Sequence, residues 1–203
     1  MAVPGRRNGL MEDEDNDVED GLFEDFVDAD DAPPPHLRHL SSAAHSGDLP
    51  ALRLALDNLD GDIDQPVEDG DTALHLTCLY GHLPCAQLLL ERGASLEAKD
   101  EDGAIPLHDA CAGGYTEIVQ LLISRATDPE CVRRMLDTVD VEGDTPLHHA
   151  ARGEHLDTIR LLLSHGASLT LKNSYNETPC ELAEPGSDAR AFLEAATTNA
   201  IGH

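Results

Sequence analysis

Histidine and cysteine are the residues of this chain that could bind a metal or act as nucleophiles. The 203 residues include eleven histidines and five cysteines, and both types ligate transition metals. No Cys-x-x-Cys pair is present, and His75, His108 and His148 recur within the same short motif. Recurrence at one position of a motif indicates a structural role in each copy. We therefore expect no metal site and no cofactor.

The cysteines and the other motifs give no sign of catalysis. All cysteines except Cys131 fall where the repeating pattern needs a small or apolar core residue, and buried cysteine behaves as a small hydrophobe. The odd count indicates free thiols in a reducing compartment. The chain has no Gly-x-Ser-x-Gly, no phosphate-binding loop and no His-Glu-x-x-His motif, so the sequence predicts that the protein is not an enzyme.

The charge of the chain excludes two kinds of partner. Forty acidic residues against thirteen basic ones give a net charge of −27. Such a protein repels phosphate backbones and anionic lipid surfaces, so we expect no direct binding to nucleic acid or membranes. The first residues contain Arg6 and Arg7 but no apolar stretch after them. We therefore expect no secretory signal, and a monomer in the cytoplasm or the nucleus.

Residues 1–35 differ in composition from the rest of the chain. They hold twelve acids against two arginines and end in Pro33–Pro35. A segment with so little apolar surface cannot offset the entropy lost on folding, which predicts a disordered acidic tail. Its acidic-hydrophobic motif Leu22–Val27 is typical of segments that fold in a partner's groove or shield basic clients. An inert solubilising tail is equally compatible with this composition.

A short motif recurs along the remainder of the chain. Its copies begin at Thr72, Ile105, Thr145 and Thr178, with spacings of 33, 40 and 33 residues, so the middle copy carries a seven-residue insertion. Threonine before proline favours a helix start, and glycines follow each short apolar helix pattern. One such unit cannot bury its apolar face alone, which predicts stacked helix pairs.

These copies resemble the ankyrin-repeat family. The residues that carry the resemblance are Thr145–Ala151, which read Thr-Pro-Leu-His-His-Ala-Ala, and the closing Leu-Leu-Leu-Ser-His-Gly-Ala of 161–167. The resemblance implies an all-α repeat solenoid, an ankyrin-type helix-turn-helix stack with β-hairpin loops. The expected repeats lie near 36–66, 67–99, 100–139, 140–172 and 173–196, the first and last degenerate, followed by a flexible C-terminus at 197–203. The resemblance also implies that the recurrent histidine ties hairpins to helices.

Acidic residues recur in the expected hairpins. Aspartate is common in such turns, but Glu68, Glu101 and Glu142 are not turn formers. A row of like charge on stacked hairpins would attract a cationic partner. The candidate partner-binding acids of the hairpins are Glu68, Asp69, Asp71, Asp100, Glu101, Asp102, Asp140, Glu142 and Asp144.

The exposed side of each first helix is the second candidate surface. In ankyrin complexes this concave strip and the hairpin tips are the usual contacts. Leu76, Leu79 and Tyr80 would form an apolar-aromatic patch, which serves either for binding or for packing against the next repeat. The further candidates for partner binding are Asp109, His149, Arg152 and, in the last hairpin, Tyr175.

These features together predict a non-catalytic protein–protein interaction adaptor. The charge favours an escort or chaperone for a basic client, such as a ribosomal protein or a histone. The alternative is a regulatory inhibitor or transcriptional co-regulator that docks on a folded kinase or transcription factor. The insertion near 126–135 carries Arg133 and Arg134 next to Arg125. It is either a solvated extension or a basic knob that holds the acidic tail.

Overall fold

The computed structural model describes residues 34–68 and 70–201. Most of the predicted acidic tail, including Leu22–Val27, and the candidate Asp69 lie outside the described residues. The helices in this part of the chain are α1 Pro35–Ser46, α2 Leu49–Asp57, α3 Ala73–Leu79, α4 Leu83–Glu91, α5 Pro106–Ala112, α6 Thr116–Arg125, α7 Pro129–Asp137, α8 Pro146–Arg152, α9 Leu156–Ser164, α10 Pro179–Leu182 and α11 Asp188–Ile201.

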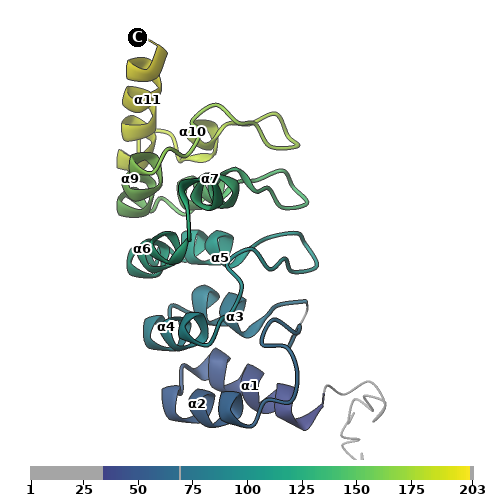
Figure 1. The fold of residues 1–203 in the computed structure, drawn as a ribbon. Helices are drawn as coiled ribbons and strands as arrows, with labels where there is room; N and C mark the ends of the chain where they lie inside the picture. Colours follow the sequence, from purple (N-terminus) through teal and green to yellow (C-terminus); the bar gives the residue numbers. More distant parts are fainter. Residues whose placement is uncertain (1–33, 69, 202–203) are drawn as a thin grey trace, which may run out of the picture. The chain divides into compact units, whose positions relative to one another are not determined.

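The helices pack as antiparallel pairs that follow one another in chain order (Figure 1). The first helices α1, α3, α5, α8 and α10 pack each against the next, and so do the second helices α2, α4, α6, α9 and α11. A single apolar core runs through all the pairs. The predicted solenoid of stacked helix pairs is therefore confirmed.

The recurrent histidine closes the start of α3, α5 and α8. His75 Nδ1 accepts the backbone N–H of Thr72 at 3.1 Å, and His148 Nδ1 accepts that of Thr145 at 3.0 Å. The threonine hydroxyls also lie 3.0 and 2.8 Å from these nitrogens. α5 begins after Ile105, which has no hydroxyl, so His108 holds only the backbone N–H there.

The same histidines join each helix to the hairpin that follows. Since Nδ1 accepts a hydrogen bond, the proton is assigned to Nε2, which donates to the backbone oxygens of Ala104, Asp144 and Glu177 at 3.2–3.3 Å. Burial lowers the pKa of all three imidazoles, that of His108 to about 4. The recurrent histidines are thus neutral structural groups.

The insertion forms a helix of its own, α7. Asp128 caps it by accepting the N–H of Cys131 at 2.8 Å, and proline follows in the first turn. Cys131, Met135 and Leu136 are buried, so the one cysteine without an assigned position also belongs to the core.

The last helix is longer than the sequence analysis predicts. Leu193 on α11 is fully buried against the preceding pair. α11 continues to Ile201, although residues 197–203 were expected to be flexible. Residues 187–201 contain no glycine or proline that would end the helix. The Thr197 hydroxyl donates to the Leu193 carbonyl within the helix. None of the helices in the described ranges is long and apolar enough to cross a membrane.

Candidate functional site

The hairpin loops between the helix pairs lie along one side of the stack (Figure 1). Backbone hydrogen bonds join neighbouring tips. Val141 N–H donates to the Asp102 carbonyl at 2.7 Å, and Ser174 N–H donates to the Glu142 carbonyl at 2.8 Å. Because the last three tips are bonded in this way, their acids have fixed places along one edge, which we call the hairpin edge (residues 100–104, 140–144 and 173–177).

The first residue of each of the last three hairpins builds the turn. Asp100 Oδ1 accepts the N–H of Ala104 at 2.8 Å, and Asp140 Oδ1 accepts two backbone N–H groups at 2.9 Å each. Asn173 makes the same two bonds in the last hairpin. Asp100 and Asp140 are half-buried. They stabilise the edge and offer at most their second oxygen to a partner.

The exposed acids of the hairpins do not all share one turn position. Glu101 and Val141 occupy the second position of their hairpins, whereas Asp102 and Glu142 occupy the third. Glu68 is also exposed and accepts a hydrogen bond from Ser41 Oγ at 3.1 Å. The row therefore runs through Asp102 and Glu142 rather than through three equivalent glutamates. It ends at the exposed Tyr175, which takes the third position of the last hairpin.

The five predicted contact residues of the fourth repeat interact with one another, and Glu142 Oε2 lies 3.8 Å from Arg152 Nη2. Asp144 is fully buried, accepts Nδ2 of Asn173 at 2.8 Å and forms an ion pair with Arg152. His149 Nε2 lies 2.8 Å from Asp140 Oδ2. Asp144 is therefore too buried to contact a partner, contrary to the prediction, because its carboxylate ties the fourth hairpin to the fifth.

The apolar-aromatic patch differs from the predicted one, because it loses Leu76 and gains His45. Leu76 is only 3 % exposed because α3 is packed between α1 and α5, so it is a core residue. Leu79 and Tyr80 are 38 % and 41 % exposed. The ring of Tyr80 lies 4.2 Å from that of His45 on α1. The exposed patch therefore consists of Leu79, Tyr80 and His45.

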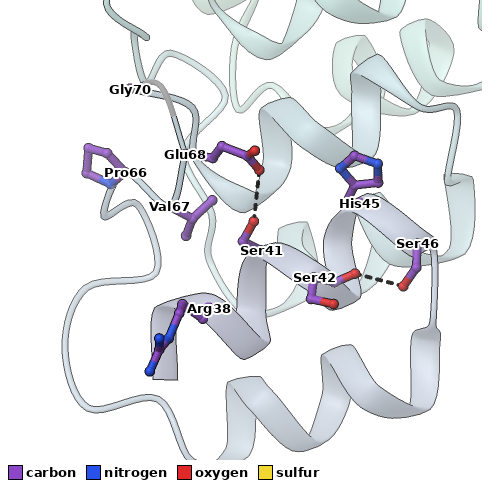
Figure 2. A pocket seen from close by; sticks show the side chains of 9 residues that line it. All are labelled: Arg38, Ser41, Ser42, His45, Ser46, Pro66, Val67, Glu68 and Gly70. Carbon is purple, nitrogen blue, oxygen red and sulfur yellow. Dashed lines mark hydrogen bonds between the residues drawn. The ribbon is translucent and has the colours of Figure 1, made fainter. Parts of the chain in front are cut away.

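A groove next to this patch was not foreseen. It measures about 720 Å³ and lies between α1 and the first hairpin, with Arg38 near one end and His45 near the other (Figure 2). Serines of α1 line its floor, and Ser41 is bonded to Glu68 across it. The first repeat lacks the Thr-Pro motif, so the sequence analysis assigned no exposed surface to its first helix, α1.

The arginines around the insertion are paired with carboxylates of the array. Arg134 donates two bonds to Glu97 at 2.9 and 3.0 Å. Arg125 lies 3.7 Å from Glu91, and Arg133 on α7 lies 3.7 Å from Asp137. These contacts favour the reading of the insertion as a structural extension over that of a free basic knob.

Two clusters bring possible metal ligands within 4.8 Å of one another, namely Asp71, His75 and Asp100, and Asp140, Asp144 and His149. In the first, both ring nitrogens of His75 already hold backbone groups. In the second, Arg152 and Asn173 occupy the Asp144 carboxylate. The arrangement of neither cluster favours a metal ion.

Asp109 on α5 differs from these engaged residues. Its buried Oδ2 atom has no hydrogen-bond partner within residues 34–68 and 70–201. Burial, and then the charges of Asp71 and Asp100, raise the pKa of Asp109 to about 8. A carboxyl group with this pKa is mostly neutral at pH 7, which spares the protein a third adjacent negative charge.

The fold and the hairpin edge define a helical repeat scaffold of the kind that binds other proteins. Models of ankyrin repeats match residues 40–131, as three copies, and residues 142–174. Together they cover more than half of the chain, and the protein belongs to the ankyrin-repeat family. No curated protein matches the chain. Ankyrin repeats are typically non-catalytic and mediate protein–protein interactions.

Proposed function

We propose that this protein is a non-catalytic adaptor that binds a basic protein along the hairpin edge and escorts it by shielding its charge. The observation that carries the proposal is the chain of backbone bonds between hairpin tips, along which Glu101, Asp102 and Glu142 are exposed. Carboxylates held in line produce a potential that attracts a cationic protein and fixes its orientation. We expect it to act as a monomer in the cytoplasm or the nucleus.

The placement of the basic residues supports the same proposal. Arg92, Arg134 and Arg152 each form an ion pair within the array. Pairs of this kind use up many of the thirteen basic residues, while the forty acids leave a large excess of negative charge. A basic partner would supply the positive charge that the array itself lacks.

A second candidate function is regulation of a folded kinase or transcription factor. The observation in its favour is the patch of Leu79, Tyr80 and His45, because exposed aromatic residues are preferred anchors in protein interfaces. In this case binding would depend on apolar contact rather than on charge.

Affinity purification at low and at high salt, followed by identification of the bound proteins, tests the proposal. An escort would recover basic proteins at low salt and lose them at high salt. Recovery of neutral or acidic proteins, with binding indifferent to salt, would contradict it. A Leu79→Ser, Tyr80→Ser double variant that abolishes such salt-independent binding would favour the regulator instead.

A further inference from the structure

The large apolar side chains that the fold leaves exposed are concentrated at the last two hairpins. Seven such side chains are exposed within the described ranges. Four of them lie in the hairpins 140–144 and 173–177 or within two residues of these hairpins, namely Val139, Val141, Leu171 and Tyr175. Single exposed apolar residues are common on protein surfaces, whereas grouped ones mark interaction sites.

Val141 and Tyr175 stand at the tips of these two hairpins, and the turns do not use their side chains. The side chains are 66 % and 65 % exposed. The turn bonds are made by the backbone and by the side chains of Asp140 and Asn173. Turns favour glycine, proline, asparagine, aspartate and serine rather than valine or tyrosine. Neither turn therefore requires the apolar side chain that it presents.

Backbone bonds fix the places of these two residues along the hairpin edge. Val141 N–H is bonded to the Asp102 carbonyl. The next residue, Glu142, accepts the N–H of Ser174, which directly precedes Tyr175. Along the edge, Asp102 therefore comes first, Val141 and Glu142 follow, and Tyr175 comes last. We call Val141 and Tyr175 the apolar tips.

The charge of the hairpin edge changes in the same direction. The hairpin 100–104 exposes Glu101 and Asp102, and the hairpin 140–144 exposes Glu142. The hairpin 173–177 exposes no acid, since its Glu177 is half-buried. An exposed lysine precedes both the first and the last of these hairpins, so the difference between them lies in their acids. A basic segment is therefore attracted to the first two hairpins rather than to the last one.

We propose that the hairpin edge binds a partner segment in which a cluster of arginines or lysines adjoins an apolar or aromatic side chain. The basic cluster contacts Glu101, Asp102 and Glu142, and the apolar side chain contacts the apolar tips. This inference rests on the proposed function and names the chemistry of the partner segment. Charge complementarity selects the basic part, and Tyr175 is of the type preferred as an anchor in protein interfaces. The two parts are not interchangeable, so the edge also sets the direction in which the segment lies.

Titration of the full chain with two peptides tests this inference. One peptide has six arginines followed by Gly-Gly-Leu-Trp, and the other has six arginines followed by Gly-Gly-Ser-Ser. We expect the first to bind roughly tenfold more tightly in calorimetry at low salt. The ratio should persist at high salt, where both peptides bind more weakly, because salt screens charges but not apolar contact. The protein contains no tryptophan, so a shift of the peptide's emission to shorter wavelength reports that its tryptophan becomes buried.

Three variants locate the effect. Val141→Ser, Tyr175→Ser should remove both the ratio and the emission shift. Leu54→Ser is the matched control, because Leu54 on α2 is 65 % exposed and lies outside the hairpins, and it should keep both. Glu101→Gln, Asp102→Asn should weaken the two peptides equally and leave their ratio unchanged. All five side chains are exposed, so the variants should fold as the natural chain does.

The outcomes separate this inference from the proposed function. Equal affinity of the two peptides, or a ratio that survives in Val141→Ser, Tyr175→Ser, would overturn the role of the apolar tips while leaving the adaptor intact. Failure of both peptides to bind would count against the adaptor itself. Sedimentation of the natural chain tests a second copy as the occupant. A dimer that Val141→Ser, Tyr175→Ser abolishes would assign the apolar tips to self-association and would also overturn the inference.

Discussion

Replacing Asp109 with asparagine should stabilise the protein at neutral and alkaline pH. The pKa of this carboxyl group rises from 3.8 to about 8 on folding, chiefly because the group is buried. Between these values the folded state holds a proton that the unfolded state has released. Stability therefore falls as pH rises from about 4 to about 8, and the loss is complete above that range.

The size of the effect follows from the same shift. By pH 7 the carboxyl group is about three pH units above its unfolded pKa of 3.8, and each unit corresponds to about 1.4 kcal/mol, so the loss amounts to as much as about 4 kcal/mol. Asparagine has nearly the shape of the neutral acid and leaves the same position without a hydrogen bond. The variant and the natural chain should therefore be equally stable near pH 4 and diverge by up to that amount at pH 7.

Urea unfolding at pH 4, 7 and 9, followed by circular dichroism, measures this difference. Other carboxylates titrate in both proteins, so their contributions cancel in the comparison. Glu117→Gln controls for the change in net charge and should show no such divergence. A difference between Asp109→Asn and the natural chain that is constant with pH would refute the burial of an uncompensated carboxyl group at this position.

Two further predictions concern the links between repeats. His108→Gln should cost about 1–3 kcal/mol at pH 7, because it weakens the bond to the Asp144 carbonyl. That cost should shrink as pH falls from 6.5 to about 4, because over this range the imidazole of the natural chain binds a proton only when the chain unfolds, which lowers the stability of the natural chain. A cost that stays constant with pH in urea unfolding would contradict a neutral buried histidine. Gly114→Ala should lower the melting temperature more than Gly93→Ala. Both glycines have positive φ, but a Cβ at Gly114 would collide with the ring of His155, whereas one at Gly93 meets nothing within 4 Å; equal shifts would be evidence against that collision.

The fold could be predicted from the sequence because each repeat encodes it locally. A helix-start threonine or proline, the bridging histidine and the closing glycine recur at intervals near 33 residues, and the stack follows from burying the apolar faces. The length of α11 was missed because the last ankyrin repeat was assumed to end at residue 196. Residues 197–201 contain no glycine or proline that would end a helix there.

The surface was harder to predict than the fold. Leu76, Asp109 and His149 occupy the same position of successive repeats, yet the first is buried, the second lacks a partner for one oxygen and the third is bonded to Asp140. The environment of a surface residue can also depend on a neighbour more than 25 residues away in the sequence, as that of Asp144 depends on Asn173. Periodicity assigns a position in the repeat, but it does not assign these contacts.

The central claim is that the hairpin edge recruits a basic protein through its exposed acids. The most direct test is the dissociation constant of the complex with the most abundant basic protein recovered by affinity purification. The Glu101→Gln, Asp102→Asn, Glu142→Gln variant is compared with a variant neutralised at three exposed acids elsewhere, Asp60→Asn, Glu117→Gln and Asp157→Asn.

Exposed charges contribute about 0.2–1 kcal/mol each, so the hairpin variant, which loses three, should bind roughly 3- to 150-fold more weakly at low salt. The difference between the two variants should fade at high salt, where exposed charges are screened. Equal loss in both variants would mean that net charge alone attracts the partner. That result would contradict the hairpin edge as the binding surface.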